Sequence, residues 1–336
     1  MKQEPMPPHA QMMQYIVGRW ISKPLYVAAE LGIADLLAEE GPLTPEALAE
    51  KTGVQAPFLY RILRALAAVG VFQEDEQQRF GLTPLSDCLR TGAMRSMARM
   101  FNADWNDLAW MHLMEGVRTG RTPFETAHGM PFFAWLERHP EAARLVNEAN
   151  SVKAATSHRA IVEVYGFEGI GSITDVGGGT GALLMAVLEA HPTMTGVVAD
   201  LPQVVPEAEA AIRATGMEAR CRTQACDFFH WVPDGSDACM LSHVLHDWPD
   251  EACSVVLGCC REALPPGGRL LVVEMVVPPG NAFSVAKLLD MEMMVVTGGR
   301  ERTEEEYRGL LEAAGFRLVQ VVSTPEAVCL LEAVRR

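Results

Sequence analysis

Four glycines within five positions, between a strand-like stretch and a helix-like stretch, constrain this chain more than any other feature. Residues 172–176 are rich in β-branched side chains, residues 177–181 read Gly-Gly-Gly-Thr-Gly, and residues 182–188 are apolar throughout. Glycine lets a backbone adopt positive φ and approach a ligand closely. The N-terminus of the following helix offers unpaired N–H groups to negative charge. The stretch therefore predicts a strand–turn–helix unit that can bind a ligand.

The spacing of these glycines leaves the ligand open. Gly177, Gly179 and Gly181 form G-x-G-x-G, whereas dinucleotide-binding turns read G-x-G-x-x-G. A turn without a ligand is an alternative on this stretch alone. Asp200, however, ends the next apolar strand pattern, where an acid can hydrogen-bond the hydroxyls of a ribose. The two features predict a nucleoside-containing cofactor and leave dehydrogenase and methyltransferase as candidates.

Strand and helix patterns alternate from residue 172 to the end, which predicts a doubly wound, Rossmann-like α/β sheet. The last two of seven strand patterns have no helix between them, so they should form an antiparallel hairpin, an ending that a plain dinucleotide-binding fold does not predict. The expected strands cover 172–175, 195–200, 219–226, 237–242, 269–277, 316–322 and 327–334, and the expected helices cover 181–190, 203–214, 250–263, 284–297 and 303–314.

The N-terminal region has a different pattern, typical of a winged helix. Residues 10–40 have helical spacing, and residues 43–90 predict two helices followed by a two-stranded hairpin. A winged helix suggests DNA, but the would-be recognition helix carries only Arg61 and Arg64 as cations. A structural or dimerising role is favoured. The Met- and Tyr-rich first helix suits a dimer interface, and ordinary core packing explains it equally well.

These patterns divide the chain into three expected parts. Residues 1–95 form a winged-helix dimerisation domain, residues 96–165 a helical linker and substrate-pocket region, and residues 166–336 a cofactor-binding domain. The middle part is rich in Met and aromatic side chains, which wall pockets for flat apolar ligands as well as filling cores. The expected pocket residues are Phe101, Trp105, Asp247, Met291 and Met294.

Composition excludes several classes of function. Residues 1–100 carry 10 Lys and Arg against 11 Asp and Glu, and residues 165–336 carry 12 against 24, so a basic nucleic-acid-binding face is not expected. Residues 1–8 lack the apolar core of a signal peptide and no apolar run is long enough to span a membrane, so a cytoplasmic protein without membrane partners is expected. The eight scattered cysteines lack zinc spacing, and we interpret them as small buried side chains in a reducing compartment.

One histidine and two acids are expected at the same sheet edge. His246 follows the fourth strand pattern, Glu274 lies near the end of the fifth, and Glu301 follows a Gly-Gly-Arg turn. Ligands of open α/β sheets bind beyond the carboxyl ends of the strands. A general-base histidine oriented by carboxylates is favoured over a purely structural histidine. His243 and His246 suggest a metal, but no third ligand has a strong spacing, so no metal is expected.

Five motifs occur in order and resemble the caffeic-acid-type (class I, plant-type) S-adenosylmethionine-dependent O-methyltransferases, in particular their bacterial branch that acts on phenolic natural products. The resemblance covers almost the whole chain and implies a homodimer and a small aromatic acceptor. The motifs are Asp175-Val-Gly-Gly-Gly-Thr-Gly181, Asp200-Leu-Pro202, Asp227-Phe-Phe229, Leu245-His-Asp-Trp248 and Gly299-Arg-Glu-Arg-Thr303.

The resemblance also implies roles for individual residues. His246 resembles the proton acceptor of the family, and Glu274 and Glu301 resemble the two acids that bracket it. The residues expected to bind S-adenosylmethionine are Gly177, Gly178, Gly179, Asp200, Leu201, Asp227, Phe228 and Ser242. Asp200 would take the ribose hydroxyls, Leu201 would pack on the adenine, and Asp227 with Phe228 would hold the adenine edge.

At two positions this sequence departs from the plant members of the family, which puts specificity for phenylpropanoid substrates in question. Ser242 stands where plant members often have Lys, and Val296 stands where they often have the Asn that contacts substrate methoxy groups. The sequence favours methylation of a phenolic hydroxyl. An N- or C-methyltransferase is the alternative within the enzymes, and a winged-helix regulator that senses a nucleoside is the alternative outside them. A NAD-dependent dehydrogenase is disfavoured by the glycine spacing and the final hairpin.

Overall fold

The computed structural model describes residues 6–336, and for residues 153–156 it describes the backbone alone. Residues 1–5, part of the segment in which no signal peptide is expected, lie outside the described residues. The chain forms two compact units. The first contains the residues up to Leu108 and Leu136–Val152, and the second contains Ala109–Trp135 and Lys153–Arg336. The three-part division expected from the sequence, 1–95, 96–165 and 166–336, stays a prediction.

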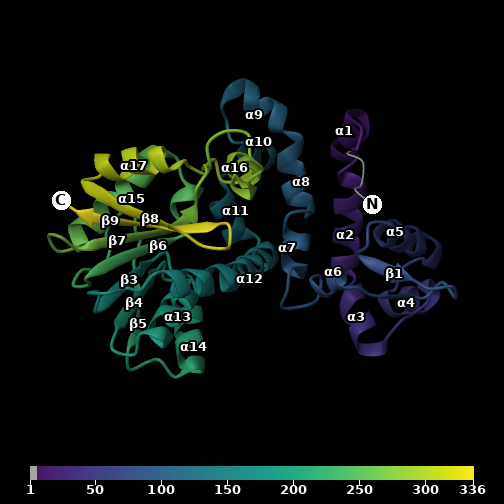
Figure 1. The fold of residues 1–336 in the computed structure, drawn as a ribbon, viewed down its shortest axis with the longest axis horizontal. Helices are drawn as coiled ribbons and strands as arrows, with labels where there is room; N and C mark the ends of the chain where they lie inside the picture. Colours follow the sequence, from purple (N-terminus) through teal and green to yellow (C-terminus); the bar gives the residue numbers. More distant parts are fainter. Residues whose placement is uncertain (1–5) are drawn as a thin grey trace. The chain divides into compact units, whose positions relative to one another are not determined.

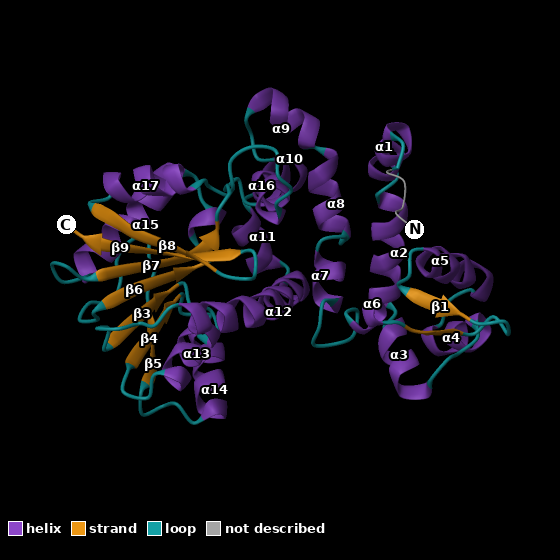
Figure 2. Cartoon of the chain, in the orientation of Figure 1, coloured by secondary structure: helices purple, strands orange, loops and turns teal. Residues whose placement is uncertain are grey.

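The first unit contains the helices and the short hairpin expected from its sequence (Figure 2). Thr44 caps the fourth helix, because its Oγ1 accepts a hydrogen bond from the backbone N–H of Ala47 at 3.3 Å. The core joins the helices to the hairpin through Leu59, Leu63 and Phe80, which are almost fully buried. The elements are α1 (Pro8–Ile16), α2 (Arg19–Glu30), α3 (Ile33–Glu40), α4 (Pro45–Thr52), α5 (Ala56–Ala68), β1 (Phe72–Glu74), β2 (Phe80–Leu82), α6 (Pro84–Asp87) and α7 (Arg95–Met100).

The second unit is built on a seven-stranded sheet in the order β5-β4-β3-β6-β7-β9-β8. The first five strands in this order run parallel, whereas β9 is antiparallel to both β7 and β8, which confirms the expected terminal hairpin. The strands are β3 (Ser172–Val176), β4 (Thr195–Asp200), β5 (Cys221–Ala225), β6 (Ala238–Ser242), β7 (Arg269–Met275), β8 (Phe316–Ser323) and β9 (Val328–Arg335).

Helices cover both faces of this sheet, with α13 and α14 on one side and α15 and α17 on the other (Figure 1). Successive residues of β7 alternate between the two cores: Leu271 packs toward α13, and Val272 packs toward α15. The central strands are therefore apolar on both faces. The remaining helices of the chain, of which α8, α11 and α12 are divided between the two units, are α8 (Asp104–Met111), α9 (Leu113–Thr119), α10 (Pro123–His128), α11 (Phe132–Arg138), α12 (Pro140–Val164), α13 (Ala182–Ala190), α14 (Val205–Thr215), α15 (Asp250–Ala263), α16 (Val285–Val296) and α17 (Glu304–Ala313).

The strand order determines where the candidate site lies on the sheet. From β3 the chain continues outward to β4 and β5, and it then returns to β6 on the other side of β3. The connections therefore diverge between β3 and β6, which leaves a crevice at the carboxyl ends of these two strands. The glycine turn follows β3, and the segment with His246 follows β6 as a short 3₁₀ helix, η1 (Leu245–Asp247).

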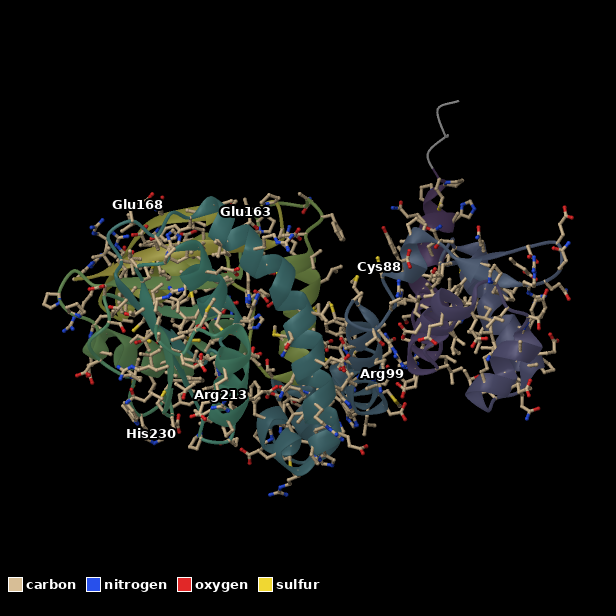
Figure 3. The ribbon with its side chains drawn as sticks, turned by 90° about the horizontal axis from the view of Figure 1, so that it is seen from below. Cys88, Arg99, Glu163, Glu168, Arg213 and His230 are labelled. Carbon is tan, nitrogen blue, oxygen red and sulfur yellow. The ribbon has the colours of Figure 1, made fainter. Side chains whose placement is uncertain are left out.

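Two expectations from composition can be compared with the structure. No helix in the described part of the chain is long and apolar enough to cross a membrane. The cysteines are free in the described residues, and Cys221, Cys239 and Cys260 are buried as expected. The prediction of burial was wrong for Cys88, which is exposed because it follows the short surface helix α6 (Figure 3).

Candidate functional site

The glycine turn after β3 has a backbone that only glycine accommodates. Gly177, Gly179 and Gly181 have φ of 69°, 57° and 76°, in the left-handed region. A Cβ on Gly181 would lie 2.5 Å from Cγ2 of Val198, whereas a Cβ on Gly179 would meet nothing within 4 Å. The turn is therefore packed tightly against the sheet at one end and open at Gly179.

Asp200 binds the open part of this turn. Its Oδ2 accepts a hydrogen bond from the N–H of Gly179 at 2.8 Å, and its Oδ1 accepts one from the N–H of Leu201 at 2.7 Å. Burial raises the pKa of Asp200, and the two N–H donors oppose that rise. Burial also raises the pKa of Asp175, at the end of β3, to about 7, and the charge of Asp200 adds to this shift.

The other cofactor candidates gather around the same turn. A Cβ on Gly177 would lie 3.3 Å from Cε1 of Phe228, so this ring packs beside the turn. Asp227 accepts a hydrogen bond from the N–H of Phe229 at 3.0 Å, and its Oδ2 lies 2.9 Å from Nδ1 of the exposed His230, labelled in Figure 3.

Ser242 ends β6, beside this turn. Its Oγ is buried and has no hydrogen-bond partner within residues 6–336. A buried hydroxyl normally has a partner, so this one is available to a bound polar group.

His246 is almost fully buried and is surrounded by acids. Its Nδ1 lies 2.7 Å from Oε1 of Glu301 and 3.7 Å from Oε2 of Glu274, and its Nε2 lies 3.9 Å from Oδ1 of Asp247. The structure therefore brings together the histidine and both acids that the sequence singled out. The close partner of Nδ1 is Glu301.

Glu274 acts mainly on the backbone of η1. Its Oε1 accepts hydrogen bonds from the N–H groups of Leu245 at 2.9 Å and of His246 at 3.3 Å. Its Oε2 has no hydrogen-bond partner in the described structure. Burial raises the pKa of Glu274 to about 7, against the lowering by His246. Glu274 thus fixes the turn that presents His246. The spacing of these residues in the sequence did not indicate this role.

The acids decide the protonation of His246. Burial alone would lower its pKa, but the charges of Glu274 and Asp247 and the hydrogen bond to Glu301 outweigh burial and raise the pKa to about 9. At neutral pH the imidazole of this structure is therefore protonated. To accept a proton, this imidazole must first lose its own.

The segment after α16 holds η1 at several points, and sequence reasoning missed most of them. The N–H of Arg300 donates to the carbonyl of His246 at 2.8 Å. The buried guanidinium of Arg302 donates to the carbonyls of Leu245 at 2.8 Å and Trp248 at 2.9 Å, and it pairs with Asp250 at 2.7 Å. The sequence carries no clear signal for these contacts, because Arg302 lies among charged residues, between Arg300-Glu301 and Glu304-Glu305-Glu306.

The five residues expected to line the substrate pocket are divided between the two units. Phe101 and Trp105 belong to the first unit, whereas Asp247, Met291 and Met294 belong to the second. Met294 lines a cavity of about 190 Å³ together with Leu113, Pro123 and Gly298. This cavity is smaller than the pockets of about 300 Å³ or more that hold drug-sized molecules. The five residues stay candidates.

Comparison with known families identifies both halves of the chain. Residues 110–317 match the O-methyltransferase domain, and residues 13–92 match the O-methyltransferase dimerisation domain. A phenazine O-methyltransferase of Lysobacter antibioticus, PhzM, is 40% identical over 324 residues, which cover 96% of this chain and 95% of that protein.

Two further relatives bear on fold and on chemistry. The solved structure of LaPhzM has a TM-score of 0.93 with 40% identity, and the match covers 98% of this chain and 100% of that one. A phenazine-1-carboxylate N-methyltransferase of Pseudomonas aeruginosa is 32% identical over 326 residues, which cover 96% of both proteins. Relatives of the same architecture therefore include enzymes that methylate oxygen and enzymes that methylate nitrogen.

Proposed function

The chain belongs to the O-methyltransferase family that joins a dimerisation domain to a methyltransferase domain, and from this membership we propose its acceptor, its base and its assembly. It is an S-adenosylmethionine-dependent O-methyltransferase. The acceptor we propose is a phenolic hydroxyl of an aromatic small molecule, a natural product. The names of the relatives support this class, because they include methyltransferases of phenazine, mitomycin and aminohydroxybenzoate compounds.

We assign cofactor binding to the crevice between β3 and β6. S-adenosylmethionine supplies, when bound, a methyl group activated by a positively charged sulfur. Gly177, Gly178 and Gly179 would leave room for its amino-acid part, and Asp200 would hold the ribose hydroxyls. The buried, unpartnered Oγ of Ser242 and the open position at Gly179 support the fit.

The adenine would lie near the next loop of this crevice. Leu201 would pack on its ring, and Asp227 with Phe228 would hold its edge. The position of the Phe228 ring beside Gly177 supports this arrangement.

We propose His246 as the general base, and the buried contact of its Nδ1 with Oε1 of Glu301 at 2.7 Å carries the proposal. A phenol has a pKa near ~10 and a free imidazole near ~6.5, so an unperturbed histidine would take the proton uphill by about 5 kcal/mol. With a pKa of about 9 the same transfer costs roughly 1.4 kcal/mol. Glu301 would hold Nδ1 so that Nε2 accepts the proton, and Glu274 would keep the backbone of His246 in place.

Methylation of an amine is the second candidate, because a relative at 32% identity carries the name of an N-methyltransferase. An amine already has a lone pair at working pH and needs less help from a base. The buried His246–Glu301 pair would then have no chemical task, so it supports oxygen as the acceptor atom. A regulator without catalytic activity is set aside by the family assignment.

Methyl transfer from labelled S-adenosylmethionine to a panel of phenols and aryl amines tests both candidates. The full-length protein and His246→Ala are compared by mass spectrometry of the products. We expect label on a phenolic oxygen and a loss of at least 100-fold in kcat for the variant. Label on nitrogen, or a fully active variant, would contradict the proposed base and leave the cofactor unaffected.

We also propose that the enzyme is a homodimer. The match to the dimerisation domain supports this, and so do the exposed apolar side chains of the first two helices. Ile16 and Trp20 are 69% and 72% exposed in a single chain. Apolar surface of this kind is usually covered by a partner.

A further inference from the structure

The turn after β6 brings a second histidine to the buried acid of the site. Nδ1 of His243 lies 3.7 Å from Oε2 of Glu274, and Nδ1 of His246 lies 3.7 Å from the same oxygen. One donor atom from each of these three side chains lies within 4.8 Å of the other two. The sequence offered no third ligand for His243 and His246, because Glu274 is supplied by the neighbouring strand β7.

The oxygen that both imidazoles share is held in place. Oε1 of Glu274 is fixed by the N–H groups of Leu245 and His246, which directs Oε2 away from the backbone. Glu274 is fully buried, and this Oε2 has no hydrogen-bond partner in the part of the chain that is described. A buried carboxylate oxygen without a partner is costly unless a cation or a donor approaches it.

His243 is also placed by the backbone. Its φ is 54°, in the left-handed region that a residue other than glycine seldom adopts, and its N–H donates to the carbonyl of Val273 at 3.0 Å. Such backbone strain persists only where the surroundings over-determine it, and it gathers at functional sites. The side chain of His243 is 15% exposed, whereas that of His246 is 6% exposed. His243 is therefore the more exposed of the two side chains, although both of its ring nitrogens are buried.

The donor set selects the kind of ion. Two imidazoles and one carboxylate suit borderline divalent ions such as Zn²⁺ and Co²⁺, whereas Mg²⁺ and Ca²⁺ prefer oxygen ligands alone. Donors about 2.0–2.1 Å from a tetrahedral zinc ion lie roughly 3.4 Å from one another. The two separations between a histidine and Glu274 are 3.7 Å and all three donors lie within 4.8 Å of one another, so the side chains must move closer together. An ion on Nδ1 of His246 would also replace the hydrogen bond of this nitrogen to Glu301. Glu301 and Asp247 add negative charge beside the three donors.

We propose that His243, His246 and Glu274 form a binding site for a borderline divalent transition-metal ion, with Zn²⁺ as the ligand to test. Binding of the ion rests on these three side chains alone. Its consequence rests on the proposed function: an ion on either nitrogen of His246 removes the proton acceptor. Coordination at Nε2 uses the accepting lone pair, and coordination at Nδ1 leaves the proton on Nε2. The site would therefore be inhibitory.

The test titrates Co²⁺ and Zn²⁺ into full-length protein freed of metal by a chelator. The visible absorption of Co²⁺ reports nitrogen coordination, and calorimetry gives the affinity for Zn²⁺. The key variant is His243→Asn, because Asn tolerates positive φ and lacks the imidazole. The matched control is His191→Asn, at the end of α13. Thermal unfolding of each variant checks that it is folded.

We expect the parent and the control to bind one Zn²⁺ per chain and His243→Asn to bind it at least tenfold more weakly, with loss of the Co²⁺ absorption. Equal binding by His243→Asn, or no binding by the parent, would overturn the site. A second arm measures methyl transfer with and without Zn²⁺, using the acceptor found in the labelled panel. Inhibition of the parent by Zn²⁺ that is relieved in His243→Asn supports the proposed inhibitory role of the site.

The two proposals fail separately in this design. Full activity with Zn²⁺ bound would overturn the inhibitory consequence and count against His246 as the base, while the metal site stands. Absence of metal binding in a protein whose His246→Ala variant is inactive would overturn the metal site and leave the base in place.

Discussion

At the scale of single residues, the environment of His246 decides what the site can do. Burial favours the neutral form of an imidazole, as His158 illustrates: burial lowers its pKa to about 4. His246 is equally buried, yet the acids around it raise its pKa to about 9. The difference between the two histidines is the set of neighbouring carboxylates, so the acids are the part of the site to change first.

Glu301→Gln keeps the size of this partner and removes its charge. We expect kcat to fall by about 100-fold or more, because the imidazolium formed in the reaction loses its closest anion. The pKa that governs the rate should also move down. Glu304→Gln is the control, since Glu304 pairs with Arg308 on the exposed side of α17. Steady-state kinetics of both variants test this prediction. Equal kcat values for Glu301→Gln and Glu304→Gln would refute the role of Glu301.

The activity of the parent enzyme should rise with pH. A proton acceptor must be neutral, and His246 is protonated below a pKa of about 9. We therefore expect kcat/KM to increase up to tenfold per pH unit from pH 6 and to level off near pH 9. Rates measured between pH 6 and 10 give the profile. A rate that is independent of pH over this range would contradict the assignment.

Asp175 couples stability to pH in the opposite sense from an ordinary acid. Its folded pKa of about 7 lies above its value of about 4 in an unfolded chain, so the folded state holds more protons between these values. The free energy of unfolding should therefore fall as pH rises from 4 to 7, by up to about 1.4 kcal/mol per pH unit.

Denaturant unfolding of the parent and of Asp175→Asn measures this dependence. The variant should lose the part of the slope that Asp175 contributes, because asparagine does not titrate. The part due to Glu274, whose pKa is also raised to about 7, should remain. Asp234→Asn, at an exposed position, should keep the full slope. A slope shared equally by all three proteins would mean that other groups produce it.

At the scale of elements, the segment 299–303 fixes the turn that presents His246. The two run side by side, since the N–H of Arg300 bonds to the carbonyl of His246 and Arg302 binds the carbonyls on either side of it. Gly299 makes this approach possible: a Cβ at this position would lie 2.0 Å from the carbonyl oxygen of His246. The motif that contains Glu301 is thus a backbone clamp as well as a source of one carboxylate.

Gly299→Ala should push the two segments apart. We expect a large loss of kcat together with a stability loss of about 1–3 kcal/mol, the usual range for inserting a carbon into a packed site. Gly309→Ala is the matched control, because a Cβ there meets nothing within 4 Å inside α17. It should leave activity unchanged and stabilise the helix by roughly 0.5–1 kcal/mol. Unchanged activity in Gly299→Ala would contradict the clamp.

At the scale of the whole molecule, each unit has its own core, yet the first helices expose apolar surface. None of the residues of α1 is buried, and Met12, Met13, Tyr15 and Ile16 are all more than half exposed. Burying such side chains is worth about 1.5–3 kcal/mol each, so a second copy of the chain would gain by covering them.

Ile16→Asp tests the homodimer. A charge in an apolar interface is costly to bury, so we expect the variant to be monomeric, or to dimerise at least tenfold more weakly, by light scattering after size exclusion. Val255→Asp, on the exposed face of α15, places the same charge elsewhere and should leave the mass unchanged. A parent protein that runs as a monomer would refute the proposal directly.

The sequence by itself determined the fold class and the antiparallel hairpin that ends the sheet. It also determined the edge of the sheet at which the candidate catalytic residues would lie. These follow from local patterns: glycines that require positive φ, apolar runs on both faces of a sheet, and acids at strand ends. It also named His246, Glu274 and Glu301. Glu274 is a carboxylate within an apolar run, and His246 and Glu301 follow a strand end and a glycine turn that were expected at the same edge of the sheet.

Only the tertiary structure decided which contacts each of these residues makes, and therefore which role each can have. Glu301 meets Nδ1 of His246, Glu274 holds the backbone of η1, Arg302 fixes the carbonyls around it, and His243 joins Glu274 from a strained turn. The residues involved come from the turn after β6, from β7 and from the segment before α17, far apart in the chain. Their distances, their burial and the resulting pKa values depend on how these elements pack, and no local pattern contains that information.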